Sequence, residues 1–176
     1  MKEETPIEKG FWRFWLSGLM LFAVMIVLNP SISNSIAPTG ISDHQAAATA
    51  VRVDAIQSAW RADGVLWLAR VSMAIDLVFI GLYSWGAWLG GKTMRSESAP
   101  GLSRLGIVIM VAAALFCVTD YTETISQFIQ VMRYEGSETL AGLAAAVRPL
   151  KTVAWLVTFV GLLAALLLRR MARRDS

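Results

Sequence analysis

Four stretches of the chain are long and apolar enough to cross a lipid bilayer. A span needs about 20 mostly apolar residues to cross a hydrocarbon core about 30 Å thick. The stretches cover residues 11–28, 65–90, 102–132 and 150–168. The pattern predicts an all-α integral membrane four-helix bundle with a small outer helical cap, folded as a single domain over residues 1–176.

The connection between the first two spans, residues 29–64, is longer than a helical hairpin needs. Its start is rich in turn-forming residues and is expected to be irregular. Ser42, followed three residues later by Gln45, is typical of a capping box. Apolar residues then recur at helical spacing: Ala46, Ala50, Val53, Ile56 and Trp60. We therefore predict an amphipathic helix over residues 43–62.

The third stretch continues its apolar stripe beyond the bilayer through Ile125, Phe128, Ile129 and Met132. A helix over residues 102–135 would be about 50 Å long at 1.5 Å per residue. We expect the stripe to pack on the loop helix, burying Val53, Ile56 and Trp60 in the outer cap. The alternative is a loop helix that lies in the membrane interface.

The last connection is predicted to hold a short helix over residues 137–145. Arg148 and Pro149 follow it. Because proline is favoured in the first turn of a helix, we expect this pair to turn the chain into the fourth span.

Lysine and arginine are unevenly divided between the two faces predicted for the membrane. Ten of the 16 fall on the side of the termini: Lys2, Lys9, Arg13, Lys92, Arg95, Arg104, Arg169, Arg170, Arg173 and Arg174. By the positive-inside rule, both termini are expected to be cytoplasmic and the loop at 29–64 to be outside. A signal peptide cleaved after Ala37 is the alternative. The long apolar run and Pro38 directly after the site favour a retained span.

Composition narrows the function classes. The chain has 56% hydrophobic and 16% charged residues and a mean hydropathy of +0.55, which excludes a nucleic-acid module, a disordered chain and a soluble enzyme. Its single cysteine, Cys117, excludes an intrachain disulfide and cysteine-based metal sites. His44 is the only histidine and is expected to be solvated in the first turn of the loop helix. We expect no cofactor and no metal.

Charged side chains inside predicted spans need an explanation, because each costs roughly 2.5–3.5 kcal/mol near a helix centre. Asp120 and Glu123 share one face of the third span, and Lys151 opens the fourth span at a similar height. Arg70 lies roughly 8 Å inside the second span. We predict that Arg70 and Lys151 neutralise the two acids in a clasp between helices. The alternative is that these charges line a pocket open to the outside.

Asp76 lies roughly 16 Å inside the second span, near the membrane midplane. It is about 120° around the helix from Arg70, which makes that arginine a poor partner. It is expected either to be protonated and hydrogen-bonded to a neighbouring helix, or to form a proton or ligand site. The predicted ligand site comprises Asp76, Tyr83, Ser72, Asp120 and Glu123.

Three short motifs resemble those of an uncharacterised family of four-span bacterial inner-membrane proteins. They are Ala-Pro-Thr-Gly-Ile at 37–41; Asp76, Phe79, Ile80 and Tyr83 in the spacing Asp-x-x-Phe-Ile-x-x-Tyr; and Asp120 with Glu123 in Asp-x-x-Glu-Asn, where Thr124 replaces the asparagine. The resemblance implies a bacterial inner-membrane location. It implies no activity.

The leading hypothesis is a non-enzymatic protein whose intramembrane polar site binds a small amphiphilic or cationic ligand, such as a lipid, from the outer side. The alternative is a scaffold or accessory subunit that joins a membrane partner or forms a homodimer through Gly86 and Gly90. A third is an enzyme that uses Asp76, Asp120 and Glu123 as acid and base, although the chain lacks the nucleophile-elbow, P-loop and HExxH motifs. The expected partners are the bilayer and such a ligand or membrane protein, without nucleic acid.

The predicted topology can be tested by cysteine labelling. Single cysteines at positions 35 and 98, in a chain whose Cys117 is replaced, should differ in their reaction with an impermeant maleimide on intact cells. Only the Ser35→Cys protein should react, because only that loop is expected outside. Equal labelling, or labelling of the Ser98→Cys protein alone, would refute the orientation.

Overall fold

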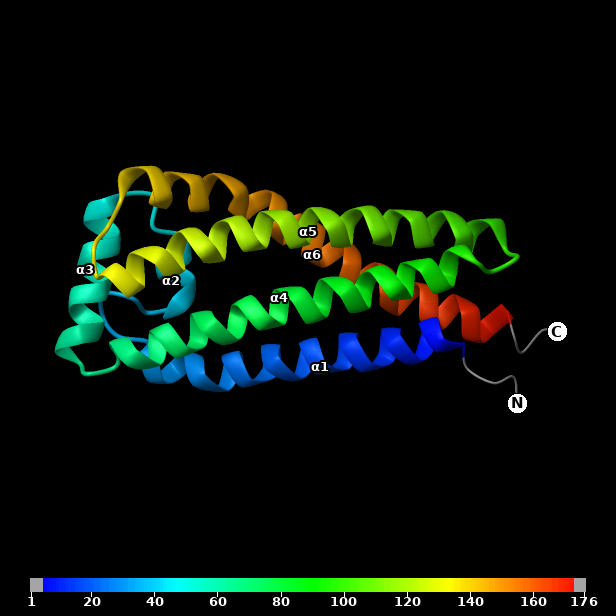
Figure 1. Cartoon of the computed structure of the whole chain (residues 1–176), viewed down its shortest axis with the longest axis horizontal. Helices are drawn as coiled ribbons and strands as arrows, with labels where there is room; N and C mark the ends of the chain where they lie inside the picture. The colour runs from blue at the N-terminus through cyan, green and yellow to red at the C-terminus, as the bar shows by residue number, and fades with distance from the viewer. Residues whose placement is uncertain (1–4, 173–176) are drawn as a thin grey trace.

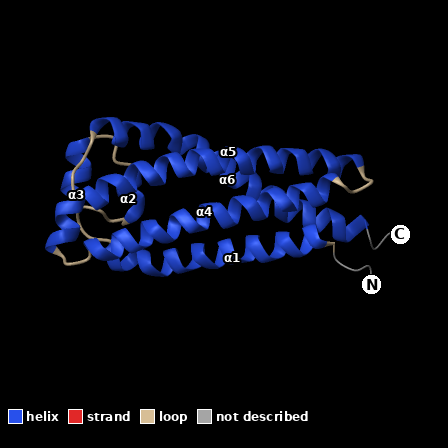
Figure 2. Ribbon diagram, viewed as in Figure 1, coloured by secondary structure: helices blue, strands red, loops and turns tan. Residues whose placement is uncertain are grey.

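The computed structural model describes residues 5–172, and this part of the chain is helical apart from short connections (Figure 2). The elements are α1 Pro6–Leu28, η1 Asn29–Ile32, α2 Ile41–Gln45, α3 Ala50–Ala62, α4 Leu66–Arg95, α5 Pro100–Arg133 and α6 Glu138–Ala172. The predicted all-α four-helix bundle is confirmed. Lys2, Arg173 and Arg174, which contribute to the charge asymmetry, lie outside the described residues.

The four long helices pack in chain order, α1 on α4, α4 on α5 and α5 on α6. Figure 1 shows that α1 begins and α6 ends at one end of the bundle, which we call the terminal end. Helices α2 and α3 cover the opposite end, which we call the cap end. Each long helix is long and apolar enough to cross a membrane, as expected of a multi-pass membrane protein.

Small residues bring α4 close to its neighbour α1. A Cβ placed on Gly86 would lie 2.4 Å from the backbone nitrogen of Trp15, so only glycine permits this approach. The predicted Gly86-x-x-x-Gly90 motif is therefore used inside the bundle and not at a homodimer seam. The chain also stays helical beyond Gly90, to Arg95, because the flanking residues remain packed.

The cap packs as predicted but is built differently. Val53, Ile56 and Trp60 are fully buried, which confirms the packed cap over the interfacial alternative. The single helix predicted over residues 43–62 is wrong: the chain leaves α2 after Gln45 and starts α3 with Thr49 as its N-cap. Since Gly40 and Thr49 precede the two helices, no capping box forms at Ser42.

Only part of the apolar stripe of the third span faces the cap: Phe128 packs against the cluster that contains Val53, Ile56 and Trp60. Ile125 and Met132 are 45% and 52% exposed, whereas Gln127 and Gln130 on the opposite side are buried. In a soluble helix an apolar stripe of this period faces the protein core. In a membrane helix the apolar side can face lipid, while the polar side must find its hydrogen bonds inside the protein.

The predicted break before the fourth span is also wrong. Helix α6 continues through Pro149 and changes direction along its length (Figure 1). A proline inside a helix removes one backbone hydrogen bond and bends the axis. Ala144 and Ala154 are buried on either side of the proline, so packing keeps both segments helical.

Candidate functional site

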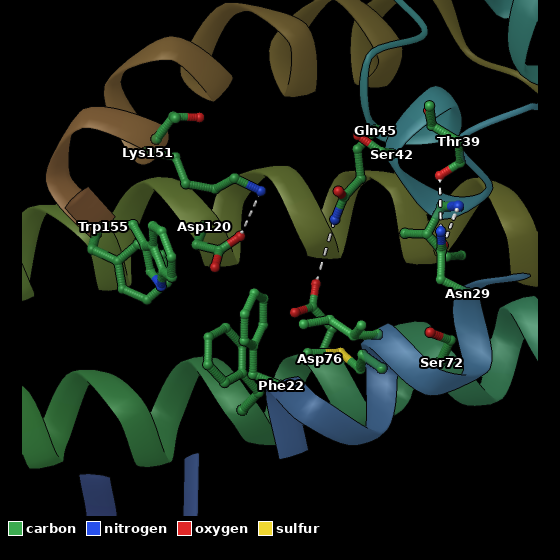
Figure 3. A pocket seen from close by; sticks show the side chains of 16 residues that line it. Phe22, Asn29, Thr39, Ser42, Gln45, Ser72, Asp76, Asp120, Lys151 and Trp155 are labelled. Atoms are coloured by element: carbon green, nitrogen blue, oxygen red, sulfur yellow. Dashed lines mark hydrogen bonds and ion pairs between the residues drawn. The ribbon is translucent and has the colours of Figure 1, made fainter. Parts of the chain in front are cut away.

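A cavity of about 380 Å³ lies among the four long helices in the half of the bundle nearest the cap (Figure 3). Its apolar wall is largely aromatic and comprises Phe22 of α1, Phe79 of α4, Phe116 of α5 and Trp155 of α6. Its polar lining includes Ser72, Asp76, Asp120 and Lys151. Each of the four helices thus contributes apolar surface, and three of them contribute polar groups.

The segment around α2 covers the cavity. The Asn29 side chain accepts a hydrogen bond from the Ile41 N–H at 3.1 Å and donates to the Thr39 carbonyl at 3.2 Å. Gly40 lies between them with a φ of 61°, and a Cβ there would meet the Asn29 side-chain oxygen at 2.5 Å. This explains why the turn requires glycine.

Helix α6 also holds the segment around α2 in place, through Arg148. Arg148 donates two hydrogen bonds of 2.7 Å, one to the carbonyl oxygen and one to the side-chain oxygen of Ser42. The serine that was predicted to cap a helix therefore anchors α2 to the bundle instead. As a result, Gln45 is held above Asp76 (Figure 3).

Asp76 lies in the cavity wall and is only 8% exposed. Its Oδ2 accepts a hydrogen bond from the Thr124 hydroxyl at 2.9 Å and a longer one from the Gln45 amide at 3.5 Å. Within residues 5–172, none of the ion pairs includes Asp76. Its carboxyl group therefore has neutral hydrogen-bond donors but no cation in direct contact.

Lys151 joins α6 to α5 through two acids. Its Nζ pairs with Asp120 Oδ1 at 3.1 Å and with a carboxylate oxygen of Glu123. The prediction for Lys151 is confirmed. The prediction for Arg70 is wrong: its Nε donates to the Val131 carbonyl at 3.1 Å. That carbonyl is among the last four of α5, which have no partner within their own helix.

The structure brings three of the five predicted ligand residues to the cavity: Ser72, Asp76 and Asp120. Glu123 is fully buried behind them, beside Lys151. Tyr83 is also fully buried and shares a 3.1 Å hydrogen bond with the Thr158 hydroxyl, away from the cavity.

The two residues that donate hydrogen bonds to Asp76 were not among the predicted site residues. Thr124 is one turn from Asp120 on the same helix face, which was a detectable signal. Gln45 comes from the loop, and nothing in the sequence indicated that it would reach Asp76. In residues 5–172, no group of three or more His, Cys, Asp or Glu side chains is arranged to hold a metal ion.

His44 belongs to α2 and is fully buried, so the prediction of a solvated histidine is wrong. Its ring stacks on Trp60 with centroids 5.3 Å apart, and its Nε2 is 3.3 Å from the Gln57 amide nitrogen. Burial lowers the pKa of His44 from 6.5 to about 3. The imidazole is therefore neutral at physiological pH and can accept the amide hydrogen.

Comparison with protein-family models, curated proteins and solved structures returned no match. The candidate function therefore depends on the chemistry of the cavity.

Removal of Lys151 is expected to destabilise the protein far more than removal of Arg70. Lys151→Gln leaves two buried carboxylates without their cation, a loss of about 3–5 kcal/mol. Arg70→Gln removes one hydrogen bond to a carbonyl, a loss of about 1–3 kcal/mol. Thermal unfolding in detergent measures both.

A double-mutant cycle tests whether Asp120 is an ion-pair partner of Lys151. Asp120→Asn should recover part of the loss in the Lys151→Gln protein but none in the Arg70→Gln protein. Additive effects of Lys151→Gln and Asp120→Asn would contradict the ion pair.

The cap should loosen in acid because His44 is neutral when folded. Unfolded His44 takes up a proton below pH 6.5, whereas the folded residue does so only near pH 3. The free energy of unfolding thus has its full value above pH 6.5. Below that pH it decreases by about 1.4 kcal/mol per pH unit, until His44 in the folded protein also takes up a proton. Hydrogen exchange of residues 41–62, corrected for intrinsic rates, should accelerate at pH 5.5. His44→Phe keeps a ring on Trp60 and should remove this extra acceleration; an unchanged response would exclude His44 as its source.

Proposed function

We propose that the protein is a non-enzymatic, multi-pass protein of the bacterial inner membrane that binds a small amphiphilic cation at Asp76. The charge asymmetry of the sequence supports cytoplasmic termini, because ten of the 16 lysines and arginines fall in the segments predicted for that side. In this orientation the cap is extracytoplasmic, and the ligand enters from that side.

The observation that carries the proposal is a nearly buried carboxyl group that faces a cavity without an ion-pair partner. Asp76 is 8% exposed, and its direct partners are Thr124 and Gln45, which are both neutral. An ionised carboxylate in such surroundings is costly unless a positive charge lies beside it. A cationic ligand in the cavity would supply that charge.

The walls of the cavity suit an organic cation better than a hydrated metal ion. The Phe22 ring lies 5.6 Å from Phe79 and 5.7 Å from Trp155, centroid to centroid. Aromatic faces attract ammonium groups by cation–π interaction, and they bury the methyl groups of a quaternary amine. A volume of about 380 Å³ lies within the range of small-molecule sites, roughly 300–1,000 Å³.

The seam between α1 and α6 suits the apolar tail of an amphiphile. Ile26 of α1 and Thr152 of α6 both line the cavity and are exposed on the outside of the bundle, Ile26 by 57%. In a membrane this surface lies among lipid chains. The headgroup can thus reach Asp76 while the tail remains outside the protein.

Binding of decyltrimethylammonium to the protein in nanodiscs of zwitterionic lipid tests the proposal. Wild type should bind this cation, measured by calorimetry with empty nanodiscs subtracted, and should not bind decyl sulfate. Asp76→Asn keeps the shape but removes the charge, and it should weaken binding about 10- to 100-fold, the equivalent of a charge-assisted contact.

Asp63→Asn is the matched control, since it makes the same chemical change at an exposed acid in the cap, remote from the cavity lining. Its affinity should equal that of wild type. Equal binding of the cation by wild type and Asp76→Asn, or equal binding of the anion, would refute the proposed site.

A further inference from the structure

Five ionisable groups form one cluster next to the cavity. They are Asp76 on α4, Asp120 and Glu123 on α5, and Lys151 and Arg148 on α6. Arg148 acts on Glu123 through its charge, although its hydrogen bonds go to Ser42. The cluster thus combines three acids with two bases.

The other charged groups nearby face elsewhere. Arg70 of α4 is bonded to the Val131 carbonyl, and His44 of α2 is stacked on Trp60. Helix α1 contributes Phe22, Met25 and Ile26 to the cavity and η1 contributes Asn29, and none of them is charged. The balance of charge at the site is therefore set by the five clustered groups.

Fully ionised, three carboxylates against two cations leave one negative charge in an interior surrounded by lipid. A buried group avoids an uncompensated charge by taking up a proton. Lys151 directly contacts Asp120 and Glu123, whereas Asp76 has no cation within contact. The additional proton of the empty site therefore belongs on Asp76.

The Thr124 hydroxyl lies between two carboxyl groups and fits this assignment. Its Oγ1 is 2.9 Å from Asp76 Oδ2 and 3.4 Å from Asp120 Oδ1, yet it has only one hydrogen to donate. With Asp76 protonated, Asp76 donates to Thr124 and Thr124 donates to Asp120. When Asp76 is ionised, rotation of the hydroxyl directs its hydrogen to Asp76. Both states form without displacement of a heavy atom.

We infer that the site exchanges one proton for each monovalent cation that it binds. The Asp76 O–H bond breaks, its electron pair stays on the carboxylate, the proton leaves to water, and the cation takes its place. The net charge of the cluster is the same before and after. This inference extends the proposed function, because it assumes that Asp76 is the cation site.

A quaternary ammonium ligand makes the test direct, because such a ligand carries no dissociable proton. Calorimetric titration of wild-type protein in nanodiscs with decyltrimethylammonium, in two buffers of different ionisation enthalpy, gives the number of protons released. We expect about one proton per bound cation at any pH at which Asp76 is protonated in the empty site, and over that range a Kd that falls about tenfold per pH unit.

Asp120→Asn is the informative variant, because it leaves two acids against two bases. Asp76 should then be ionised in the empty site, so the cation should bind without proton release and with little dependence on pH, although more weakly than in wild type at high pH because the cluster has lost one negative charge. Asp63→Asn should behave like wild type. Cation binding by wild type without proton release would overturn the exchange and leave the proposed binding site intact, whereas absence of cation binding would overturn both.

Discussion

The polar face of α5 must be buried, because lipid offers no hydrogen-bond partners to the groups on that face. This face extends from Asp120 through Glu123 and Gln127 to Gln130, and it points into the bundle along the half nearest the cap. Neighbouring elements supply ion-pair and hydrogen-bond partners to the side chains of this face. Helix α6 supplies Lys151, and the chain after α5 offers the Ser137 N–H to the Gln130 side chain at 2.8 Å.

This arrangement also explains why the bundle contains a cavity. Lys151 extends from α6 to α5, and Gln45 extends from the cap to Asp76 on α4 (Figure 3). Polar side chains that meet across a bundle at their tips hold the helices apart, and here the space between them is lined by aromatic rings. Nearer the terminal end, small residues such as Gly86 allow close contact, and the helices pack directly.

Residue types and spacing were enough to predict the spans, the buried face of the loop helix and the pairing of Lys151 with the two acids. Each follows from a property of side chains: apolar length, helical period and height along a span. The errors arose where the backbone or the surroundings decided the outcome. Arg70 pairs with a carbonyl, which sequence does not reveal, and Ile125 and Met132 in the outer part of α5 are exposed on the surface of the bundle. The approach of Gln45 to Asp76 depends on a turn held by Asn29, more than ten residues away.

Pro149 lies between two residues of α6 that serve different parts of the protein. Arg148, on its cap side, holds α2 through Ser42, and Lys151, on its other side, pairs with the acids of α5. The missing N–H of the proline leaves the Ala145 carbonyl without its usual helical donor, so α6 resists bending least at this point. A small tilt of the α6 segment on the cap side would therefore shift the cover over the cavity and leave the ion pairs unchanged. The point at which α6 bends most easily therefore lies beside the cavity.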